Sequence, residues 1–171
     1  MYTYSYNSPL GKIFFASDSV CLQGLWLEGQ KHFASTLYSV TSANYLCLPK
    51  KDLPVFQQTA KWLTIYFSGE KPDFTPPLNP QGNQFEKTVW NILLKIPYGK
   101  TTTYGQIAKQ VAKQKGIKSM SAQAVGRAIG HNPISLIIPC HRVIGANGNL
   151  TGYAGGTDKK LFLLKLENAI L

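Results

Sequence analysis

The sequence predicts an α/β protein with a small, strand-rich N-terminal part and a mainly helical C-terminal part. Apolar and polar residues alternate in short runs before residue 30, as they do in half-buried strands. After residue 83 the apolar residues recur at helical spacing. Residues 71–82 between the two parts carry four prolines and are typical of a linker. We therefore expect an N-terminal domain over residues 1–78 and a second domain over residues 79–171.

Three strands and one helix are expected in the N-terminal part. The strands are bounded by short turns, one of which contains Pro9 and Gly11 and the other Asp18 and Ser19. The helix has apolar residues at helical spacing and ends before Gly69, a residue that commonly terminates helices. The expected strands cover residues 2–6, 13–16 and 20–27, and the expected helix covers residues 55–67.

Four helices are expected in the C-terminal part, over residues 83–94, 104–114, 122–130 and 157–168. Asn83, Thr103 and Ser121 are suitable N-terminal caps for the first three helices. The second and third helices, joined by a polar connection, indicate a helix-turn-helix. The connection is longer than the usual tight turn, and helical hairpins that never touch DNA are common. The third helix has small side chains, which allow close approach either to a protein core or to a DNA groove.

The positive charge is concentrated in the C-terminal half. The chain carries a net charge of +10, of which residues 83–171 contribute +9 and residues 1–82 only +1. No carboxylate occurs from Thr88 through Thr157. A polyanionic partner explains this distribution better than a merely solvated surface, because each neutralised phosphate releases counterions. We favour nucleic acid over a membrane, since no amphipathic helix with an aromatic face accompanies the charge.

Cys140 is the candidate nucleophile. It stands beside His141 after the apolar, strand-like run of residues 134–138, and a nearby base favours the reactive thiolate form. Taken alone, these residues leave other interpretations open, because a lone cysteine is most often a small buried hydrophobe and a histidine is often structural. The chain has three cysteines, an odd number without close spacing, which indicates a reducing compartment and no disulfide framework.

The region around Cys140 resembles the methylated-DNA–protein-cysteine methyltransferases. The resemblance rests on the runs Pro139-Cys140-His141-Arg142-Val143, Asn132-Pro133 and Gly152-Tyr153-Ala154-Gly155-Gly156, and on residues 96–108. It covers roughly residues 85–167, and the N-terminal part matches only as a small strand-rich domain, which the resemblance identifies as ribonuclease-H-like. The resemblance implies irreversible, single-turnover transfer of an alkyl group from O6-alkylguanine in double-stranded DNA to the protein. It leaves open whether O4-alkylthymine is also a substrate.

The resemblance also implies roles for individual residues. Cys140 is expected to accept the alkyl group, with His141 removing its proton through a water molecule and Glu167 orienting the imidazole. Tyr104 is expected to help rotate the nucleotide out of the helix and to protonate the leaving guanine. Arg142 is expected to brace the fold. The expected substrate-binding residues comprise a hinge at Asn132, the pocket residues Tyr153, Ala154 and Gly155, and the DNA-facing residues Ala122, Gln123 and Arg127.

Gln123 is a departure from the family pattern. Family members usually carry an arginine at this position, which enters the base stack in place of the flipped nucleotide. Glutamine can fill the gap and hydrogen-bond the orphaned base, but it lacks the charge and stacking of a guanidinium. Arg127, one turn later, is expected to contact phosphate.

No cofactor and no metal are expected for this reaction. Some relatives hold zinc in the N-terminal domain, but Cys21, His32 and Cys47 are too scattered here to indicate a site. No signal peptide or membrane span is visible, so we expect a monomer in the cytoplasm, or in the nucleus of a eukaryote. Two alternatives remain: a helix-turn-helix regulator with a structural or sensor cysteine, and a cysteine hydrolase that uses Cys140 and His141.

Overall fold

The computed structural model describes residues 1–35 and 48–170. The chain divides into two compact units. The first unit consists of Met1–Gln81 together with Pro133–Ser135, and the second of Gly82–Asn132 together with Leu136–Leu171. Cys47, considered above as a zinc ligand, lies outside the described residues.

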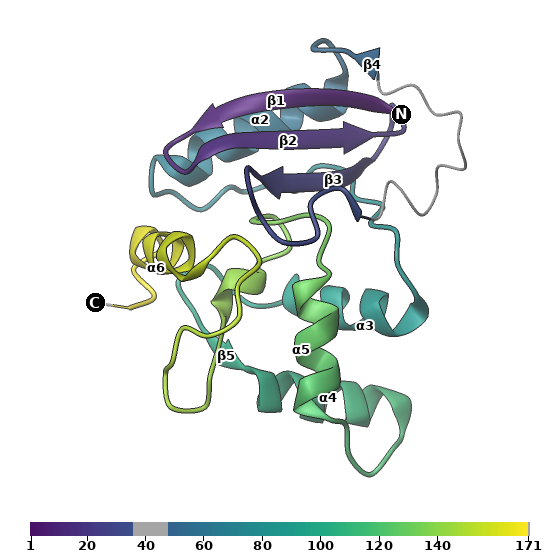
Figure 1. Ribbon diagram of the computed structural model, residues 1–171, viewed down its shortest axis with the longest axis vertical. Helices are drawn as coiled ribbons and strands as arrows, with labels where there is room; N and C mark the ends of the chain where they lie inside the picture. Colours follow the sequence, from purple (N-terminus) through teal and green to yellow (C-terminus); the bar gives the residue numbers. More distant parts are fainter. Residues whose placement is uncertain (36–47, 171) are drawn as a thin grey trace. The chain divides into compact units, whose positions relative to one another are not determined.

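The first unit is built on a four-stranded sheet (Figure 1). Its strands are β1 (Tyr2–Ser8), β2 (Gly11–Ser17), β3 (Leu22–Leu27) and β4 (Leu48–Pro49), in the order β3-β2-β1-β4. The pairs β1–β2 and β2–β3 are antiparallel, whereas β4 runs parallel to β1. Gly11 begins β2 with a φ of 93°, a conformation that glycine adopts without strain. All three strands expected from the alternation are present.

Helix α2 (Pro54–Phe67) packs against this sheet. The ring of Phe56 lies 6.1 Å from that of Tyr4 on β1 and 5.9 Å from that of Phe15 on β2. Phe15 and Phe56 are both buried, so these contacts form the centre of the N-terminal core. The expected helix is confirmed, with Pro54 at its first position, where a missing N–H is tolerated.

Two segments of the chain cover the edge strand β3. The backbone N–H of Leu22 donates to Pro77 and its carbonyl accepts from Asn79, at 2.8 Å each. Leu25 exchanges two further 2.8 Å bonds, with Pro133 and Ser135. The proline-rich segment was predicted to be a linker. Its end is instead paired with the sheet through Pro77 and Asn79. Segment 133–135 is paired with it too, although it lies late in the sequence.

The second unit contains four helices in its described residues, namely α3 (Gln84–Leu93), α4 (Tyr104–Lys115), α5 (Ala122–Gly130) and α6 (Thr157–Leu166). Asn83, Thr103 and Ser121 cap the first three helices through their side chains, as expected. Helix α4 ends at Gly116, in the left-handed conformation with a φ of 64°. The helix pair α4 and α5 is joined by residues 116–121, the arrangement expected of a helix-turn-helix with a lengthened connection.

Helices α3, α4 and α5 pack on one another around Trp90. The indole Nε1 of Trp90 donates to the carbonyl of Ala128 on α5 at 2.8 Å. Ile107 and Val111 of α4 and Val125 of α5 are fully buried. Trp90 thus lies on the buried face of α3, together with Val89, Ile92 and Leu93.

The segment before Cys140 is not the strand that its apolar residues suggested. Residues 135–137 form turns and residue 138 a bend, Leu136 has a φ of 69°, and only Ile134 makes a strand-like bridge. Cys140–Arg142 form a single 3-10 turn, η1, followed by β6 (Val143–Ile144), which pairs in parallel with β5 (Thr102–Thr103). Four of the five residues from Ile134 to Ile138 are apolar and all five are buried, and burial alone does not distinguish a strand from a folded turn.

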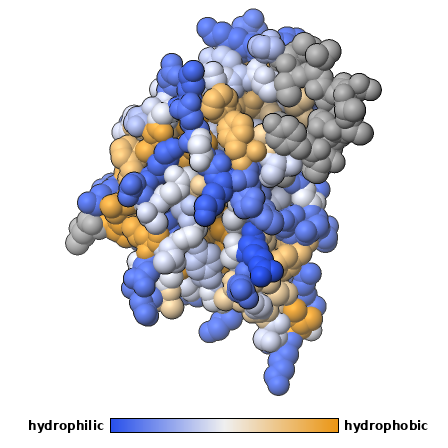
Figure 2. Space-filling model, viewed as in Figure 1, coloured by the Kyte–Doolittle hydropathy of each residue, from blue (hydrophilic) through white to orange (hydrophobic). Residues whose placement is uncertain are grey.

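The exposed surface is mixed. On the face shown in Figure 2, hydrophilic side chains separate small apolar areas. None of the helices in the described residues has both the length and the hydrophobicity of a transmembrane segment.

Asn83→Ala should destabilise the protein by about 1 kcal/mol, because it removes one half of the capping box at the start of α3. The Asn83 side chain accepts from the Glu86 N–H at 2.9 Å, and the Glu86 carboxylate accepts from the Asn83 N–H at 3.0 Å. Urea unfolding is the measurement, and Asn83→Ser, which keeps a capping oxygen, is the matched control. Equal losses of stability in both variants would contradict a capping role.

Candidate active site

Cys140 lies in the interior of the second unit, 4% exposed. The side-chain amide of Asn132 donates to its sulfur at 3.2 Å and to the Ile138 carbonyl at 2.8 Å. Asn132 follows the end of α5 and is itself buried. One amide thus ties the thiol to the end of the helix that was expected to face DNA.

Burial raises the pKa of the Cys140 thiol, because a thiolate is poorly solvated in the interior. The hydrogen bond from Asn132 and the positive charge of Lys160 act in the opposite direction but do not outweigh burial. The resting side chain is therefore a neutral thiol, and a nucleophilic reaction at Cys140 needs a base.

His141 is the neighbouring base. Its imidazole is completely buried, and Nε2 donates to Oε1 of Glu167 at 2.7 Å. Burial lowers the pKa of His141, although the Glu167 carboxylate opposes this effect. The ring is consequently neutral at pH 7 and able to accept a proton, while the carboxylate stabilises the imidazolium that would result.

Glu167, the C-cap of α6, accepts hydrogen bonds from several groups. Arg142 donates from Nε to Oε2 at 2.8 Å and from a terminal nitrogen to Oε1 at 3.0 Å, and the Gly99 N–H donates to Oε2 at 3.1 Å. Burial alone would raise the pKa of Glu167, but the bonds and charges of His141 and Arg142 lower it to about 2. Since this lies below the ordinary 4.5, the ionised carboxylate contributes stability above about pH 4.5 that is lost as the pH falls toward 2.

Arg142 holds this group in place from a second side. It also donates to the Ile96 carbonyl at 2.6 Å, and its guanidinium lies 5.7 Å from the Tyr98 ring. These contacts agree with its expected role as a brace.

Lys160 is a buried residue that the sequence interpretation missed. It is 0% exposed, and its ammonium donates to the carbonyls of Val143 at 2.6 Å and Thr151 at 3.0 Å. Burial lowers its pKa to about 8, although the charge of Cys140 opposes this. The available signal was its helical spacing with Leu163 and Leu164, which places a lysine on the apolar face of α6.

Two tyrosines adjoin the buried cluster. The ring of Tyr153, 8% exposed, lies edge-on to His141 with the ring centroids 6.5 Å apart. Tyr104, at the start of α4, donates from its hydroxyl to the carbonyls of Thr151 at 3.0 Å and Gly152 at 3.2 Å. Burial raises the pKa of both tyrosines, and a negative charge on Cys140 acts in the same direction, so both hydroxyls stay protonated and can donate.

The glycine-rich turn after Tyr153 is partly accessible. Ala154 and Gly155 are half-buried, between Tyr153 and the start of α6. Gly152, just before the tyrosine, has a φ of 70°, and a Cβ there would lie 3.1 Å from the Tyr104 hydroxyl. A side chain at this position would strain the backbone and crowd the Tyr104 hydroxyl, so glycine is favoured here.

The remaining predicted residues are on the surface of α5. Ala122, Gln123 and Arg127 are all exposed, whereas Val125, Ala128 and Ile129 of the same helix are buried. Gly126 lies close to the Tyr104 ring. A Cβ atom added to Gly126 would lie 3.7 Å from the nearest ring carbon of Tyr104. The structure thus groups Cys140, His141, Glu167 and Asn132 in the interior and leaves the three α5 residues facing solvent.

The described residues contain no group of three histidine, cysteine, aspartate or glutamate side chains that could hold a metal ion. The charged groups around Cys140 are satisfied by one another and by backbone carbonyls. The arrangement can therefore take a proton from a thiol and stabilise the resulting charge within the protein itself.

Comparison with known proteins covers nearly the whole chain. Residues 84–169 match the family described as 6-O-methylguanine DNA methyltransferase, DNA binding domain, and residues 1–80 match its ribonuclease-like domain. The methylated-DNA–protein-cysteine methyltransferase of Methanosarcina acetivorans is 42% identical over 99% of both chains. The one from Mycolicibacterium paratuberculosis is 48% identical over 94% of this chain and 88% of its own.

A solved structure agrees with these matches. The crystal structure of Mycobacterium tuberculosis OGT in complex with DNA superposes with a TM-score of 0.81 at 38% identity, covering 99% of this chain and 94% of that one. The α/β fold class predicted from the sequence is confirmed, with a ribonuclease-like N-terminal part and a helical DNA-binding part. On this evidence the chain belongs to the 6-O-methylguanine DNA methyltransferase family.

Proposed function

We propose that this protein repairs DNA by transferring an alkyl group from the O6 atom of guanine to its own Cys140. The observation that carries the proposal is the buried thiol bonded to Asn132, beside a neutral histidine that is itself bonded to an ionised carboxylate. We further propose that residues 79–171 form the DNA-binding and alkyl-transfer domain, because every residue assigned a role falls within them.

The reaction begins with removal of the thiol proton. Because burial keeps Cys140 protonated, His141 takes the proton through a water molecule, and Glu167 balances the positive charge on the imidazolium. The Asn132 amide and the Lys160 ammonium stabilise the negative sulfur. The thiolate forms only when it is needed, so the free thiol is protected from oxidation.

The sulfur then attacks the alkyl carbon in line. The S–C bond forms while the C–O6 bond breaks, and the guanine leaves after taking a proton from the Tyr104 hydroxyl. That hydroxyl must exchange its present carbonyl partners, Thr151 and Gly152, for the base. Tyr153, Ala154 and Gly155 form the wall of the pocket. The thioether on Cys140 has no easy leaving path, so each molecule reacts once without a cofactor.

Flipping of the nucleotide precedes the transfer, because an O6 alkyl group inside the base stack is out of reach of a buried thiol. The exposed residues of α5 supply the DNA contact: Ala122 allows close approach, Gln123 fills the vacated position and Arg127 holds phosphate. We propose a monomer acting in the reducing cytoplasm, or in the nucleus of a eukaryote, since one chain carries the whole site and Cys140 must stay reduced.

One equivalent of O6-methylguanine duplex should stop the reaction and add the mass of one methyl group to the peptide that contains Cys140. Intact-protein and peptide mass spectrometry are the measurements, and Cys140→Ser is the control that should gain no mass. Continued turnover on excess substrate would favour a hydrolase, and absence of any transfer would favour a regulator.

Glu167→Gln should slow transfer by roughly 100-fold, because the imidazolium loses its balancing charge. Single-turnover rates measured on the free modified base separate this effect from DNA binding. Glu86→Gln is the matched control, because Glu86 accepts a 2.9 Å bond from His131 in a separate and partly exposed pair. Parental rates in Glu167→Gln would show that this carboxylate does not assist the base.

Gln123→Ala should slow repair of duplex DNA by about fivefold, since one net hydrogen bond is worth about 1 kcal/mol. Repair of the same lesion in single-stranded DNA should be nearly normal, because no stack has to be opened. Gln123→Arg should match or exceed the parent on duplex DNA. The measurement is the ratio of duplex to single-strand rates, with the exposed Gln57→Ala as the control. Equal ratios of duplex to single-strand rates in all variants would indicate that Arg127 or Tyr104, and not Gln123, opens the base stack.

A further inference from the structure

The two edges of the sheet in the first unit differ. The edge strand β3 is covered, because Leu22 and Leu25 bond to two other segments of the chain. On the opposite side, β4 pairs with only the start of β1, at Tyr2 and Thr3 (Figure 1). The Lys50 N–H donates to the Thr3 carbonyl at 3.1 Å, and the chain then turns into α2. Within residues 1–35 and 48–170, the rest of β1 has no neighbouring strand on that side.

The outward backbone groups of this open edge belong to Ser5 and Asn7. Hydrogen bonds alternate along an antiparallel pair, so every second residue of β1 directs its N–H and carbonyl away from β2. Thr3 is one of these residues, since its carbonyl bonds to Lys50. Ser5 and Asn7 follow at intervals of two, and both are exposed. Neither has a backbone partner beyond the β1–β2 pair in the part of the chain that the structure describes.

The open edge lacks the usual protection against pairing with another chain. Exposed edges are commonly protected by a charged side chain, a proline or a β-bulge. The last four residues of β1, Ser5-Tyr6-Asn7-Ser8, carry neither a charge nor a proline, and their register with β2 is regular. An edge of this composition can accept an extended segment as an additional strand.

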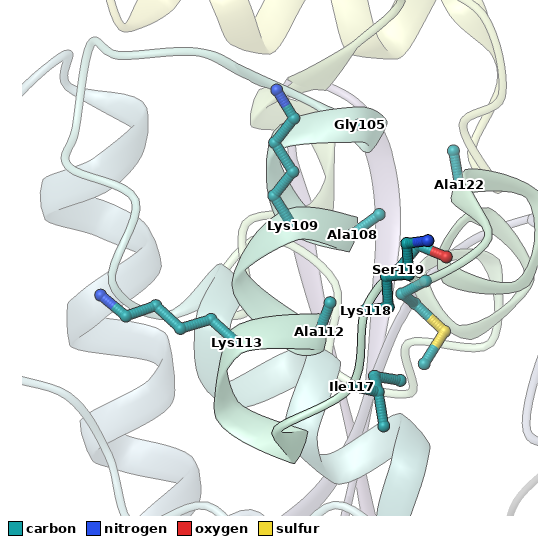
Figure 3. Close-up of a pocket in the computed structure, with 10 residues that line it drawn as sticks. Gly105, Ala108, Lys109, Ala112, Lys113, Ile117, Lys118, Ser119 and Ala122 are labelled. Atoms are coloured by element: carbon teal, nitrogen blue, oxygen red, sulfur yellow. The ribbon is translucent and has the colours of Figure 1, made fainter.

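A pocket lies beside the open edge. Another hollow, of about 530 Å³ between α4 and residues 116–121, belongs to the helix pair proposed to contact DNA (Figure 3). The pocket in the first unit has a volume of about 540 Å³. Its lining residues come from the sheet and from the end of β4, and they include Thr3, Ser5, Phe14, Pro49, Lys50 and Lys51. The pocket therefore lies where an added strand would place a side chain.

The margin of this pocket is basic. Lys50 and Lys51 are exposed, and neither forms an ion pair with any residue that the structure describes. The Lys50 ammonium lies 5.2 Å from the Tyr2 ring, at the start of β1. Asp52 follows the two lysines in sequence, but it does not line the pocket. A ligand that carries negative side chains complements these walls.

We propose that the outer edge of β1 binds an extended, acidic peptide segment of a partner protein. The segment adds a fifth strand to the sheet, bonded to the backbone of Ser5 and Asn7. One of its acidic side chains enters the pocket toward Lys50 and Lys51. A second copy of this chain is a poorer occupant, because it carries a net charge of +10 and its own β1 contains no acidic residue. None of these residues takes part in the chemistry proposed at Cys140.

Ser5→Pro tests the backbone contact. Proline removes the outward N–H, which the ladder with β2 does not use, and edge strands tolerate proline. The probe is a fluorescein-labelled octapeptide of alternating valine and glutamate, and its binding to the whole chain is measured by fluorescence anisotropy. Ser5→Pro should weaken binding by at least about fivefold, the equivalent of one net hydrogen bond. Ser5→Ala, the matched control, keeps the N–H and should bind as the parent does.

A second octapeptide, with glutamine in place of glutamate, tests the basic pocket. The parent should prefer the acidic peptide, whereas a variant with both Lys50→Gln and Lys51→Gln should bind the two peptides equally. The control carries Lys71→Gln and Lys95→Gln, which remove the same charge from exposed positions outside the pocket. This control should keep the preference for the acidic peptide.

Amide hydrogen exchange, followed by NMR, locates the bound segment. In the free protein the amides of Tyr4 and Tyr6, which face β2, should be protected, and those of Ser5 and Asn7 should exchange fast. The acidic peptide should protect Ser5 and Asn7. Absence of binding to the parent, parental affinity in Ser5→Pro, or protection confined to other residues would overturn the proposal.

Two other occupants of the edge would give different results, and either would also overturn the proposal. A dimer in analytical ultracentrifugation that Ser5→Pro dissociates would assign the edge to a second copy of the chain. Displacement of the peptide by single-stranded DNA would assign the pocket to nucleic acid. Circular dichroism shows whether Ser5→Pro is folded. If it is not, the two variants with paired lysine substitutions decide, because all four lysines are exposed.

Discussion

The buried carboxylate of Glu167 is the group on which the second unit depends. It accepts hydrogen bonds from the imidazole of His141, from two nitrogens of Arg142 and from the Gly99 backbone, so it joins α6, the 3-10 turn and the segment before β5. A single negative charge in the interior is costly unless its partners surround it. Here the hydrogen bonds that satisfy the Glu167 carboxylate also hold the imidazole of His141 in position. Both the stability of the second unit and the reactivity of its base therefore depend on Glu167.

The interior position of Cys140 has two opposing effects. It raises the pKa of the thiol and so suppresses the nucleophile, yet it also excludes water and strengthens the fields of nearby dipoles and charges. Asn132, Lys160 and the histidine–glutamate pair supply those fields from four different places in the sequence. Cys140 therefore stays protonated and unreactive until a substrate and a proton acceptor are both in place.

Local signals in the sequence were sufficient for most elements, because caps, turns and helical spacing act over a few residues. The capping residues Asn83, Thr103 and Ser121 and the three N-terminal strands illustrate this. The turn before Cys140, the buried Trp90 and the paired end of the proline-rich segment depend on contacts distant in sequence, which a single sequence does not contain. Cys140 and His141 were candidates from their adjacency, but their roles and that of Glu167 came from the resemblance, whereas Lys160 was missed because lysine is so rarely buried. The expected boundary between residues 78 and 79 stays a prediction.

The pairing of residues 133–135 with β3 makes the first unit discontinuous in sequence. A fragment ending at residue 81 would keep all four strands but would lose the two backbone bonds that satisfy Leu25. The N–H and carbonyl of Leu25 would then be free to pair with strands of other molecules. Such pairing leads to aggregation and to exchange of segments between chains. Protection of this sheet against self-association is therefore encoded far downstream, five to seven residues before the reactive cysteine.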